Sequence, residues 1–189
     1  MYKIAITGKA NTGKNTVGKL LTKGWGTKAK FIAFADPLKQ MALTAFPEIP
    51  RKWLYGSSKY RNEIIPGAAK GNCPLTVRQL LIDLGNDFGR KYKPTMWIDN
   101  FHHRLEKIYL KNPEVIVVTD CRFRNEFDYL KEEGFFQIRI VRNAHTKIND
   151  ISETNQDGIL DSEFDAVINN NGTKTDLKKQ VQSILDRLI

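Results

Sequence analysis

Short apolar runs alternate along the chain with longer stretches in which apolar residues recur every three or four positions. The runs predict five buried strands, at residues 2–7, 31–35, 115–120, 136–141 and 164–168. The longer stretches predict helices that follow these strands. This alternation is typical of an α/β fold, with a mostly parallel five-stranded sheet and helices on both faces.

Polar residues at the ends of the predicted helices support the same division of the chain. Asp36 is predicted as the N-cap of the helix after the second strand, because a proline follows it. Thr76 caps another helix, whose apolar face extends to Phe88. Thr173 and Asp176 form a capping box for the last helix.

Residues 47–74 interrupt this regular pattern. Prolines and glycines recur through them, with aromatic and basic side chains between. Such a composition indicates an irregular, mobile excursion from the core. For a chain of 189 residues we expect a single domain over 1–189, with 47–74 as a mobile insertion that binds a second substrate.

The composition is that of a globular protein with its own core, since 41% of the residues are apolar and 27% are charged. Cys73 and Cys121 form no CxxC pair and lie at no metal-ligand spacing from the histidines, so neither a disulfide framework nor a zinc site is expected. No apolar segment has the pattern of a signal peptide or the length of a membrane span. We therefore expect a cytoplasmic protein with no membrane partner.

Basic residues outnumber acidic ones, 30 to 21, which gives a net charge of +9. Such an excess favours an anionic partner, which could be a nucleic acid, a membrane surface or a phosphorylated metabolite. A basic surface that serves only solubility explains the excess equally well. The positions of the arginines along the chain therefore matter more than the total.

The strongest motif is GKANTGKNT at residues 8–16, between the first predicted strand and the first predicted helix, which is the context that a phosphate-binding loop requires. Its glycines let backbone N–H groups approach an oxyanion closely, and the helix N-terminus adds further donors. Lys14 can reach the β- and γ-phosphates of a nucleotide and follow the charge during transfer. The residues expected to bind ATP are Gly8, Asn11, Gly13, Lys14, Asn15 and Thr16.

One position departs from the usual phosphate-binding loop. Asn15 stands where a serine or threonine usually contacts Mg²⁺, and Thr16 offers a hydroxyl one residue later. Asp120 ends the most apolar strand, a position that in P-loop proteins holds Mg²⁺ through water. The departure favours a small-molecule kinase over a GTPase or a motor. It leaves Thr16 and, through water, Asp120 as the metal-binding candidates.

Phosphoryl transfer needs a second pocket in which the charge of two phosphates is neutralised. Asp36 lies at the end of the second strand, where ligands bind in open α/β sheets, although a helix N-cap explains it as well. Arg78 and Arg90 can each grip a phosphate through two hydrogen bonds, although a lone arginine on a helix usually faces solvent. Asn86, between them, can read a base edge or end a helix.

Arg122 and Arg124 follow Asp120 closely, at the end of a strand where P-loop proteins bind phosphates. The alternative is a surface ion-pair cluster with Glu126, and the position at the strand end favours the phosphate role. The adjacent histidines at 102 and 103 cannot share a helix face, so they receive no function.

Taken together, these segments resemble the bacteriophage-type deoxynucleoside monophosphate kinases. The matching stretches are Gly8–Thr16, Phe34–Lys39, Thr76–Leu81, Leu84–Arg90, Trp97 and Thr119–Glu126, with weaker matches at Ile151–Glu153 and Phe164–Asn170. They span nearly the whole chain in order. The resemblance implies a P-loop NTPase fold like that of adenylate kinase, with a core, an acceptor-binding excursion and a lid excursion.

The resemblance also implies the chemistry: ATP and Mg²⁺ as donor and metal, and a deoxynucleoside monophosphate as acceptor. Transfer would be in line, with no covalent enzyme intermediate. It implies the host cytoplasm as the location if the protein is viral. By position, the catalytic candidates are Lys14, Arg122 and Arg124. The acceptor-binding candidates are Asp36, Arg61, Arg78, Asn86, Arg90 and Trp97.

Two other functions compete with this one. A kinase resembling dephospho-coenzyme A kinase shares the phosphate-binding loop and Asp36, but the stretches 84–90 and 120–126 argue against it. A nucleic-acid-binding P-loop protein would explain the charge, but no basic run with interleaved aromatics is present, so no specific nucleic-acid binding is expected. The sequence is compatible with a homodimer. The segment at Ser152 stays unassigned, because relatives often place a histidine before the serine and Ile151 stands here.

Overall fold

The computed structural model describes residues 1–143 and 155–188. The chain divides into two compact units. Unit 1 comprises Met1–Ala33 and His102–Ile189, and unit 2 comprises Phe34–Phe101. The weaker match at Ile151–Glu153 lies outside the described residues.

Unit 1 is built on a five-stranded sheet in which every neighbouring pair of strands is parallel. The order of the strands is β2-β5-β1-β6-β7. Their bounds are Tyr2–Thr7 for β1, Ala29–Phe31 for β2, Val115–Cys121 for β5, Phe136–Val141 for β6 and Ala166–Asn169 for β7. The α/β fold and the parallel five-stranded sheet expected from the sequence are confirmed.

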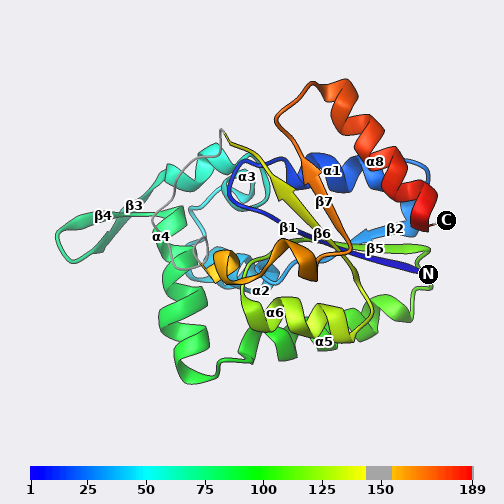
Figure 1. Cartoon of the computed structure of the whole chain (residues 1–189). Helices are drawn as coiled ribbons and strands as arrows, with labels where there is room; N and C mark the ends of the chain where they lie inside the picture. Colours follow the sequence, from blue (N-terminus) through cyan, green and yellow to red (C-terminus); the bar gives the residue numbers. More distant parts are fainter. Residues whose placement is uncertain (144–154, 189) are drawn as a thin grey trace. The chain divides into compact units, whose positions relative to one another are not determined.

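Helices cover both faces of this sheet (Figure 1). On one face, α1 (Lys14–Leu21) and α8 (Lys174–Leu188) pack on the strands. On the other lie α6 (Arg124–Glu132) and residues 102–109 of α5 (Met96–Tyr109). The apolar contacts on the α1 and α8 face join helix residues to alternate strand residues, among them Ile4, Ile6, Val17, Leu21, Val117, Ile138, Ile140, Leu177 and Ile184.

Two strands lie elsewhere than the apolar pattern predicts. The second strand was expected at 31–35, but β2 pairs with β5 through Ala29–Phe31, and Phe31 is 50% exposed. Ile32 is buried and still donates its N–H to the carbonyl of Val117, after which strand pairing ends. The apolar run thus reflects burial of residues beyond the strand. The last strand begins at Ala166, two residues later than expected.

Unit 2 contains helices and a two-stranded antiparallel hairpin with a small core of its own. Its elements are α2 (Asp36–Ala45), α3 (Arg51–Tyr55), η2 (Ser58–Asn62), β3 (Ile64–Lys70), β4 (Cys73–Thr76), α4 (Val77–Ile82), η3 (Asp83–Arg90) and the first residues of α5. The core consists of Ala42, Ile49, Leu54, Ile65, Leu75, Val77 and Leu80. Residues 47–74 are therefore regular over most of their length, and the irregular excursion expected from their prolines and glycines is wrong.

The helix after Thr76 also differs from its expectation. Thr76 caps it as predicted, since its hydroxyl oxygen accepts the N–H of Gln79 at 3.2 Å. At Asp83 the α-helix widens into a π-helix that runs to Arg90. The wider turn moves side chains away from α-helical positions, and Phe88 is 47% exposed instead of buried. Its ring contacts that of Tyr92, with centroids 5.8 Å apart.

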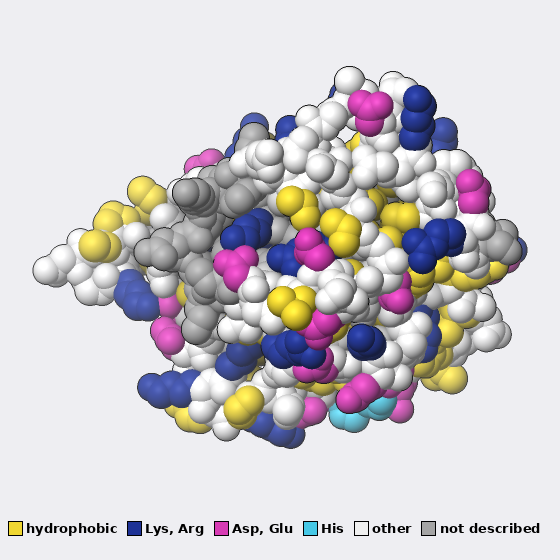
Figure 2. Space-filling view, viewed as in Figure 1, with side chains coloured by type: hydrophobic (Ala, Val, Ile, Leu, Met, Phe, Trp, Pro, Cys, Tyr) yellow, Lys and Arg dark blue, Asp and Glu magenta, His cyan; other side chains and the backbone are white. Residues whose placement is uncertain are grey.

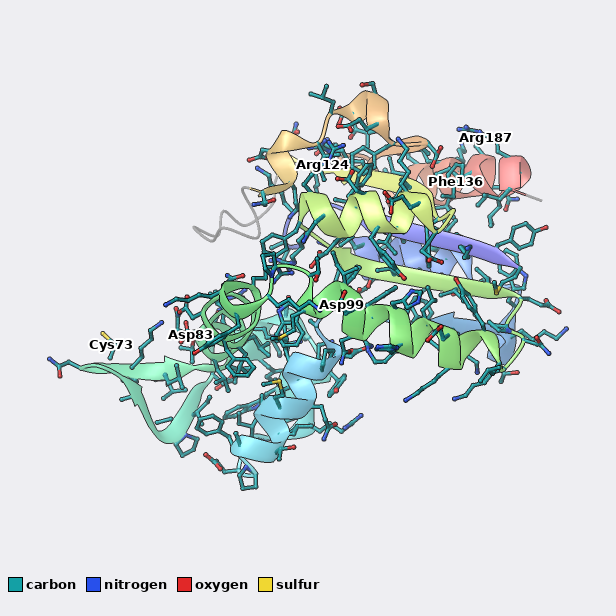
Figure 3. The ribbon with its side chains drawn as sticks, turned by 90° about the horizontal axis from the view of Figure 1, so that it is seen from below. Cys73, Asp83, Asp99, Arg124, Phe136 and Arg187 are labelled. Atoms are coloured by element: carbon teal, nitrogen blue, oxygen red, sulfur yellow. The ribbon has the colours of Figure 1, made fainter. Side chains whose placement is uncertain are left out.

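The short helical turns of unit 1 are η1 (Gly26–Lys28), η4 (Asn155–Gly158) and η5 (Asp161–Glu163). At the end of α8, Arg187 lies over the ring of Phe136 at 5.7 Å, which ties the last helix to the sheet (Figure 3). Among the described residues, no helix combines the length and the apolar character needed to cross a bilayer.

The two thiols provide a check of this fold. Cys121 is buried at the end of β5, and burial raises the pKa of its thiol well above the usual value. Cys73 is exposed on the hairpin (Figure 3). Because the thiolate is the reacting form, N-ethylmaleimide should modify Cys73 and spare Cys121 in native protein. Mass spectrometry should then find one label, none in Cys73→Ser, and two after denaturation. Rapid labelling of Cys121 in native protein would contradict the burial.

Candidate active site

The phosphate-binding loop joins β1 to α1, and its shape depends on two glycines. Gly13 precedes α1 with a φ of +105°, a region that favours glycine, and a Cβ there would lie 2.6 Å from the Asn170 amide nitrogen. At Gly8 a Cβ would lie 2.7 Å from the carbonyl oxygen of Ile140. Neither position leaves room for a side chain. The packing of neighbouring residues against the loop therefore requires glycine at both positions.

Lys14 is the first residue of α1, and its ammonium folds back onto the loop. It donates to the carbonyl oxygen of Gly8 and, at 2.8 Å, to that of Lys9. Its cationic end therefore lies directly over the loop backbone, where the oxygens of a bound phosphate can compete for it. Lys9 points elsewhere, since its ammonium forms an ion pair with Asp157 at 2.9 Å.

Side chains from the last third of the chain hold the loop in place. The Asn170 amide donates to the carbonyl of Thr12 at 2.7 Å, and Arg142 contacts the carbonyl of Asn11 at 3.5 Å. Asn170 follows β7 and Arg142 follows β6, so parallel strands bring both to the sheet edge at which the loop lies. Sequence reasoning missed Asn170, although its place directly after the last strand was the available signal.

The segment after β5 is fixed by a buried carboxylate. Glu126 is only 2% exposed, and its side chain accepts the backbone N–H of Arg122 at 2.9 Å and that of Phe123 at 3.2 Å. Because β5 neighbours β1, with Thr7 paired to Cys121, this segment and Asp120 lie at the same sheet edge as the loop. The surface ion-pair cluster weighed as an alternative is therefore wrong for Glu126, which caps the first turn of α6.

Arg124 occupies the start of α6 and is held by two carboxylates (Figure 3). Its guanidinium lies 2.9 Å from Asp128 and 2.8 Å from Glu163. Glu163 in turn accepts the N–H of Leu160, and this bond, followed by the contact with Arg124, lowers the pKa of its carboxyl. The guanidinium of Arg124 thus links α6 to η5.

At the start of α2, Asp36 does not cap the helix as predicted. Ala35 is the N-cap, and Asp36 is the first helical residue. Its carboxylate pairs with Lys39 at 3.2 Å, and the Lys39 ammonium lies 4.9 Å from the centre of the Tyr55 ring. Lys39 is a basic residue of this site that sequence reasoning did not select, although it lies one turn after Asp36.

Two of the predicted acceptor-binding arginines make contacts around η2. Arg61 donates to the carbonyl oxygens of Trp53 and Leu54, so its guanidinium closes the C-terminal end of α3. Arg78 lies in the first turn of α4 and donates to Asn62 at 3.2 Å.

The other predicted acceptor-binding residues gather around one backbone carbonyl, that of Gly85 in η3. It accepts the indole N–H of Trp97 at 2.8 Å and lies 3.3 Å from the guanidinium of Arg90. The same guanidinium lies 3.5 Å from the side-chain oxygen of Asn86. The structure therefore brings Asn86, Arg90 and Trp97 together.

The candidates divide cleanly between the two units. The residues predicted to bind ATP or the metal, or to act in catalysis, all belong to unit 1: they lie in the loop at 8–16 and at Asp120, Arg122 and Arg124. The six acceptor-binding candidates, Asp36, Arg61, Arg78, Asn86, Arg90 and Trp97, all belong to unit 2. One unit thus carries the loop that is predicted to bind phosphate, and the other carries the arginines that are predicted to bind the acceptor.

Comparisons with known proteins fit this geometry. A family model described as deoxynucleotide monophosphate kinase matches residues 55–181. A candidate deoxynucleotide monophosphate kinase of Acanthamoeba polyphaga mimivirus is 29% identical over 195 aligned residues, which cover 98% of this chain and 97% of that protein.

The solved structures that resemble this chain support the assignment of the fold and nothing beyond it. The gluconokinase from Sinorhizobium meliloti 1021 aligns with a TM-score of 0.50 at 16% identity, over 99% of this chain and 93% of its own. The protein TT1252 from Thermus thermophilus aligns in full with a TM-score of 0.48 at 19% identity, a likeness too distant to carry an argument.

Proposed function

The chain belongs to the deoxynucleotide monophosphate kinase family, and from this premise we propose that it transfers the γ-phosphate of ATP to a deoxynucleoside 5′-monophosphate. Membership makes the protein a nucleotide kinase and hence a phosphotransferase. The observation that carries the finer proposal is the division of candidates: the phosphate-binding loop lies in unit 1 and the acceptor candidates lie in unit 2.

On the donor side, the backbone N–H groups of the loop and of the first turn of α1 bind the phosphates of ATP. Lys14 exchanges its loop carbonyls for β- and γ-phosphate oxygens and stabilises the charge that moves between them. Mg²⁺, when bound with the nucleotide, neutralises charge on the same phosphates. The oxygen donors suit this hard cation: we assign the Thr16 hydroxyl directly and the Asp120 carboxylate through water.

On the acceptor side, Arg78 and Arg90 neutralise the phosphate of the deoxynucleotide, and Asn86 contacts its base. The Asp36–Lys39 pair adds a further cation and carboxylate. Arg61 has a structural role near the site, because its guanidinium caps the C-terminal end of α3. The acceptor's phosphate oxygen is already ionised near neutral pH, so positioning and charge neutralisation supply the catalysis without a general base.

The same proposal covers the protein's partners and location. We propose ATP and a deoxynucleoside monophosphate as its ligands, a cytoplasmic location, that of the host if the protein is viral, and no specific nucleic-acid binding. On the face that Figure 2 presents, Lys and Arg side chains lie among Asp and Glu side chains. A nucleic-acid-binding surface is typically a continuous basic stripe, so this mixed pattern supports the absence of specific nucleic-acid binding. A homodimer remains compatible with the proposal.

The hydrogen bond from Asn170 to the loop predicts a specific effect on the donor. Asn170→Ala should raise the KM for ATP about fivefold, because loss of one hydrogen bond lets the loop at Thr12 move. The KM for the acceptor should stay unchanged. Asn171→Ala is the matched control, since Asn171 contacts Asn169 and Asn143 instead of the loop. Equal effects of the two variants on the KM for ATP would contradict the role of Asn170.

A coupled assay of ADP release tests the proposed acceptor. Wild-type protein with ATP and Mg²⁺ is offered the four common deoxynucleoside monophosphates, the matching ribonucleotides and dephospho-coenzyme A. Stimulation by one or more deoxynucleotides is the expected result, and the active bases then define the specificity. Stimulation by dephospho-coenzyme A alone would keep the kinase fold and overturn the acceptor. Absence of stimulation in folded protein would overturn the proposal.

A further inference from the structure

The π-helix of unit 2 is built around a buried tryptophan. Trp97 is 4% exposed, and its ring lies so close to Gly89 that a Cβ on Gly89 would overlap three of its atoms. The backbone of η3 therefore packs directly on the indole. The second buried glycine, Gly85, differs, because a Cβ there would make only ordinary contacts, 3.6 Å from Leu38 and 3.7 Å from Arg90. Gly89 alone is thus required by the tryptophan.

The indole also holds the π-helix by a hydrogen bond. Its N–H donates to the Gly85 carbonyl at 2.8 Å, and the guanidinium of Arg90 reaches the same oxygen at 3.3 Å. The N–H of Lys91 donates to the carbonyl of Asn86, which is the five-residue spacing of a π-helix. The Gly85 carbonyl therefore accepts a side-chain donor from α5 as well as one from within η3.

We propose that Trp97 and Gly89 are positioning residues, which hold the π-helix in the register that presents Asn86 and Arg90 to the acceptor nucleotide. In an α-helical register these two side chains would point in other directions, because each turn would contain fewer residues. The proposal rests on the proposed function, in which Arg90 binds the acceptor phosphate. It assigns Trp97 an indirect role, whereas the resemblance places it among the acceptor contacts.

Burial and hydrogen bonding favour the indirect role. An aromatic ring that stacks on a base needs an open face, but the Trp97 ring is 4% exposed and packs on Gly89. Its N–H, the group that would read a base edge, is already bonded to Gly85. Arg90, adjacent to Gly89 in sequence, is partly buried and touches the same carbonyl. A change at Trp97 therefore reaches the acceptor through Arg90.

Two substitutions test the proposal, each with a matched control. Trp97→Phe keeps a ring and removes the N–H donor, and its control is Trp53→Phe in the same unit. Gly89→Ala introduces the overlap with the indole, and its control is Gly85→Ala, for which there is room. For each variant the KM for ATP, the KM for the best deoxynucleotide and kcat are measured. The exchange of the Trp97 indole proton with water is followed by NMR, with its signal assigned by loss in Trp97→Phe.

The expected result is a rise of about five- to tenfold in the acceptor KM for Trp97→Phe and at least as much for Gly89→Ala, with the KM for ATP within about twofold of wild type. Trp53→Phe should stay near wild type, and Gly85→Ala should raise the acceptor KM clearly less than Gly89→Ala does. In wild type the indole proton should exchange slowly, and in Gly89→Ala it should exchange rapidly. In a Trp97→Ala background, Gly89→Ala should cause no further rise in the acceptor KM.

Two results would overturn the proposal: an acceptor KM unchanged by Trp97→Phe in an active enzyme, or an equal rise in the KM values of ATP and acceptor. Failure of the proposed function looks different, because the wild type itself would then phosphorylate no deoxynucleotide. In that case the NMR comparison still tests whether Trp97 packs on Gly89, since this measurement needs no substrate. Rapid exchange of the wild-type indole proton would show that this contact does not hold.

Discussion

Replacement of Lys14 by alanine is expected to lower kcat by about 10³-fold, with a folded protein and a smaller change in the KM for the acceptor. The physical reason is the position of its ammonium over the phosphate-binding loop, where it donates to the backbone carbonyls of Gly8 and Lys9. A charge that follows the moving phosphoryl group stabilises the transition state more than bound ATP. Steady-state kinetics with saturating ATP and acceptor measures the effect, and circular dichroism checks the fold.

Lys9 supplies the matched control for this experiment. It is a lysine of the same loop, but its ammonium forms an ion pair with Asp157, and its side chain is 34% exposed. Lys9→Ala should therefore change kcat only a few-fold, in line with the small contribution of exposed ion pairs. Equal losses in Lys9→Ala and Lys14→Ala would mean that the loop needs positive charge in general, and would contradict the specific role of Lys14.

The second large effect is expected at Arg122, where alanine should lower kcat by about 10²-fold or more, as loss of one preorganised donor does in other enzymes. The buried carboxylate of Glu126 fixes the backbone of Arg122 at the end of β5, on the strand next to β1. An arginine held at this edge is well placed to neutralise phosphate charge during transfer. We expect the loss mainly in kcat, because the charge develops in the transition state.

A substitution at Arg124 tests whether Arg122 alone acts on the phosphates or whether Arg122 and Arg124 both do. Its guanidinium is bound by Asp128 and Glu163, and its side chain is 49% exposed. Arg124→Ala should therefore lower kcat no more than about threefold and reduce the free energy of unfolding only slightly, because exposed ion pairs contribute little. A kcat loss in Arg124→Ala as large as that in Arg122→Ala would restore Arg124 as a catalytic residue and contradict its linking role.

Much of the sheet could be predicted from the sequence, because a parallel strand buried on both faces is a short apolar run. The bounds of β1 and β6 agree with the expectation to the residue. The apolar run at 31–35 predicted the position of β2 wrongly, because Ile32 is buried outside the strand. Apolar residues indicate burial, but they do not indicate which backbone groups pair. Pairing depends on the register with β5, which lies more than eighty residues further along the chain.

In unit 2 the sequence carried signals of unequal strength. The hairpin of β3 and β4 turns at Gly71, which has a φ of +60°, and Gly71-Asn72 between two short runs is a turn signal that could have revealed it. The π-helix gave no such signal. Its apolar spacing fits an α-helix, and the π-helix occurs together with the close packing of Trp97 on Gly89, which lies outside the local pattern.

The candidate site shows the same contrast between local and distant contacts. The phosphate-binding loop was identified because all of its residues are adjacent in sequence. Asn170 contacts the loop across more than 150 residues, so its place directly after the last strand is the one local signal, and the contact itself depends on the fold. In the sequence, Glu126 figures only in the alternative of a surface ion-pair cluster with Arg122 and Arg124. Its burial follows from the two backbone N–H groups that it accepts at the start of α6.

The most direct measurement of the central claim is to follow the γ-phosphate of ATP itself. Wild-type protein is incubated with γ-labelled ATP, Mg²⁺ and one deoxynucleoside monophosphate, and the products are separated. The label is expected in the deoxynucleoside diphosphate, in amounts equal to the ADP formed, and Lys14→Ala should transfer it about 10³-fold more slowly. Label released only as inorganic phosphate, at a rate that does not depend on the acceptor, would contradict the claim and identify a nucleotide hydrolase instead.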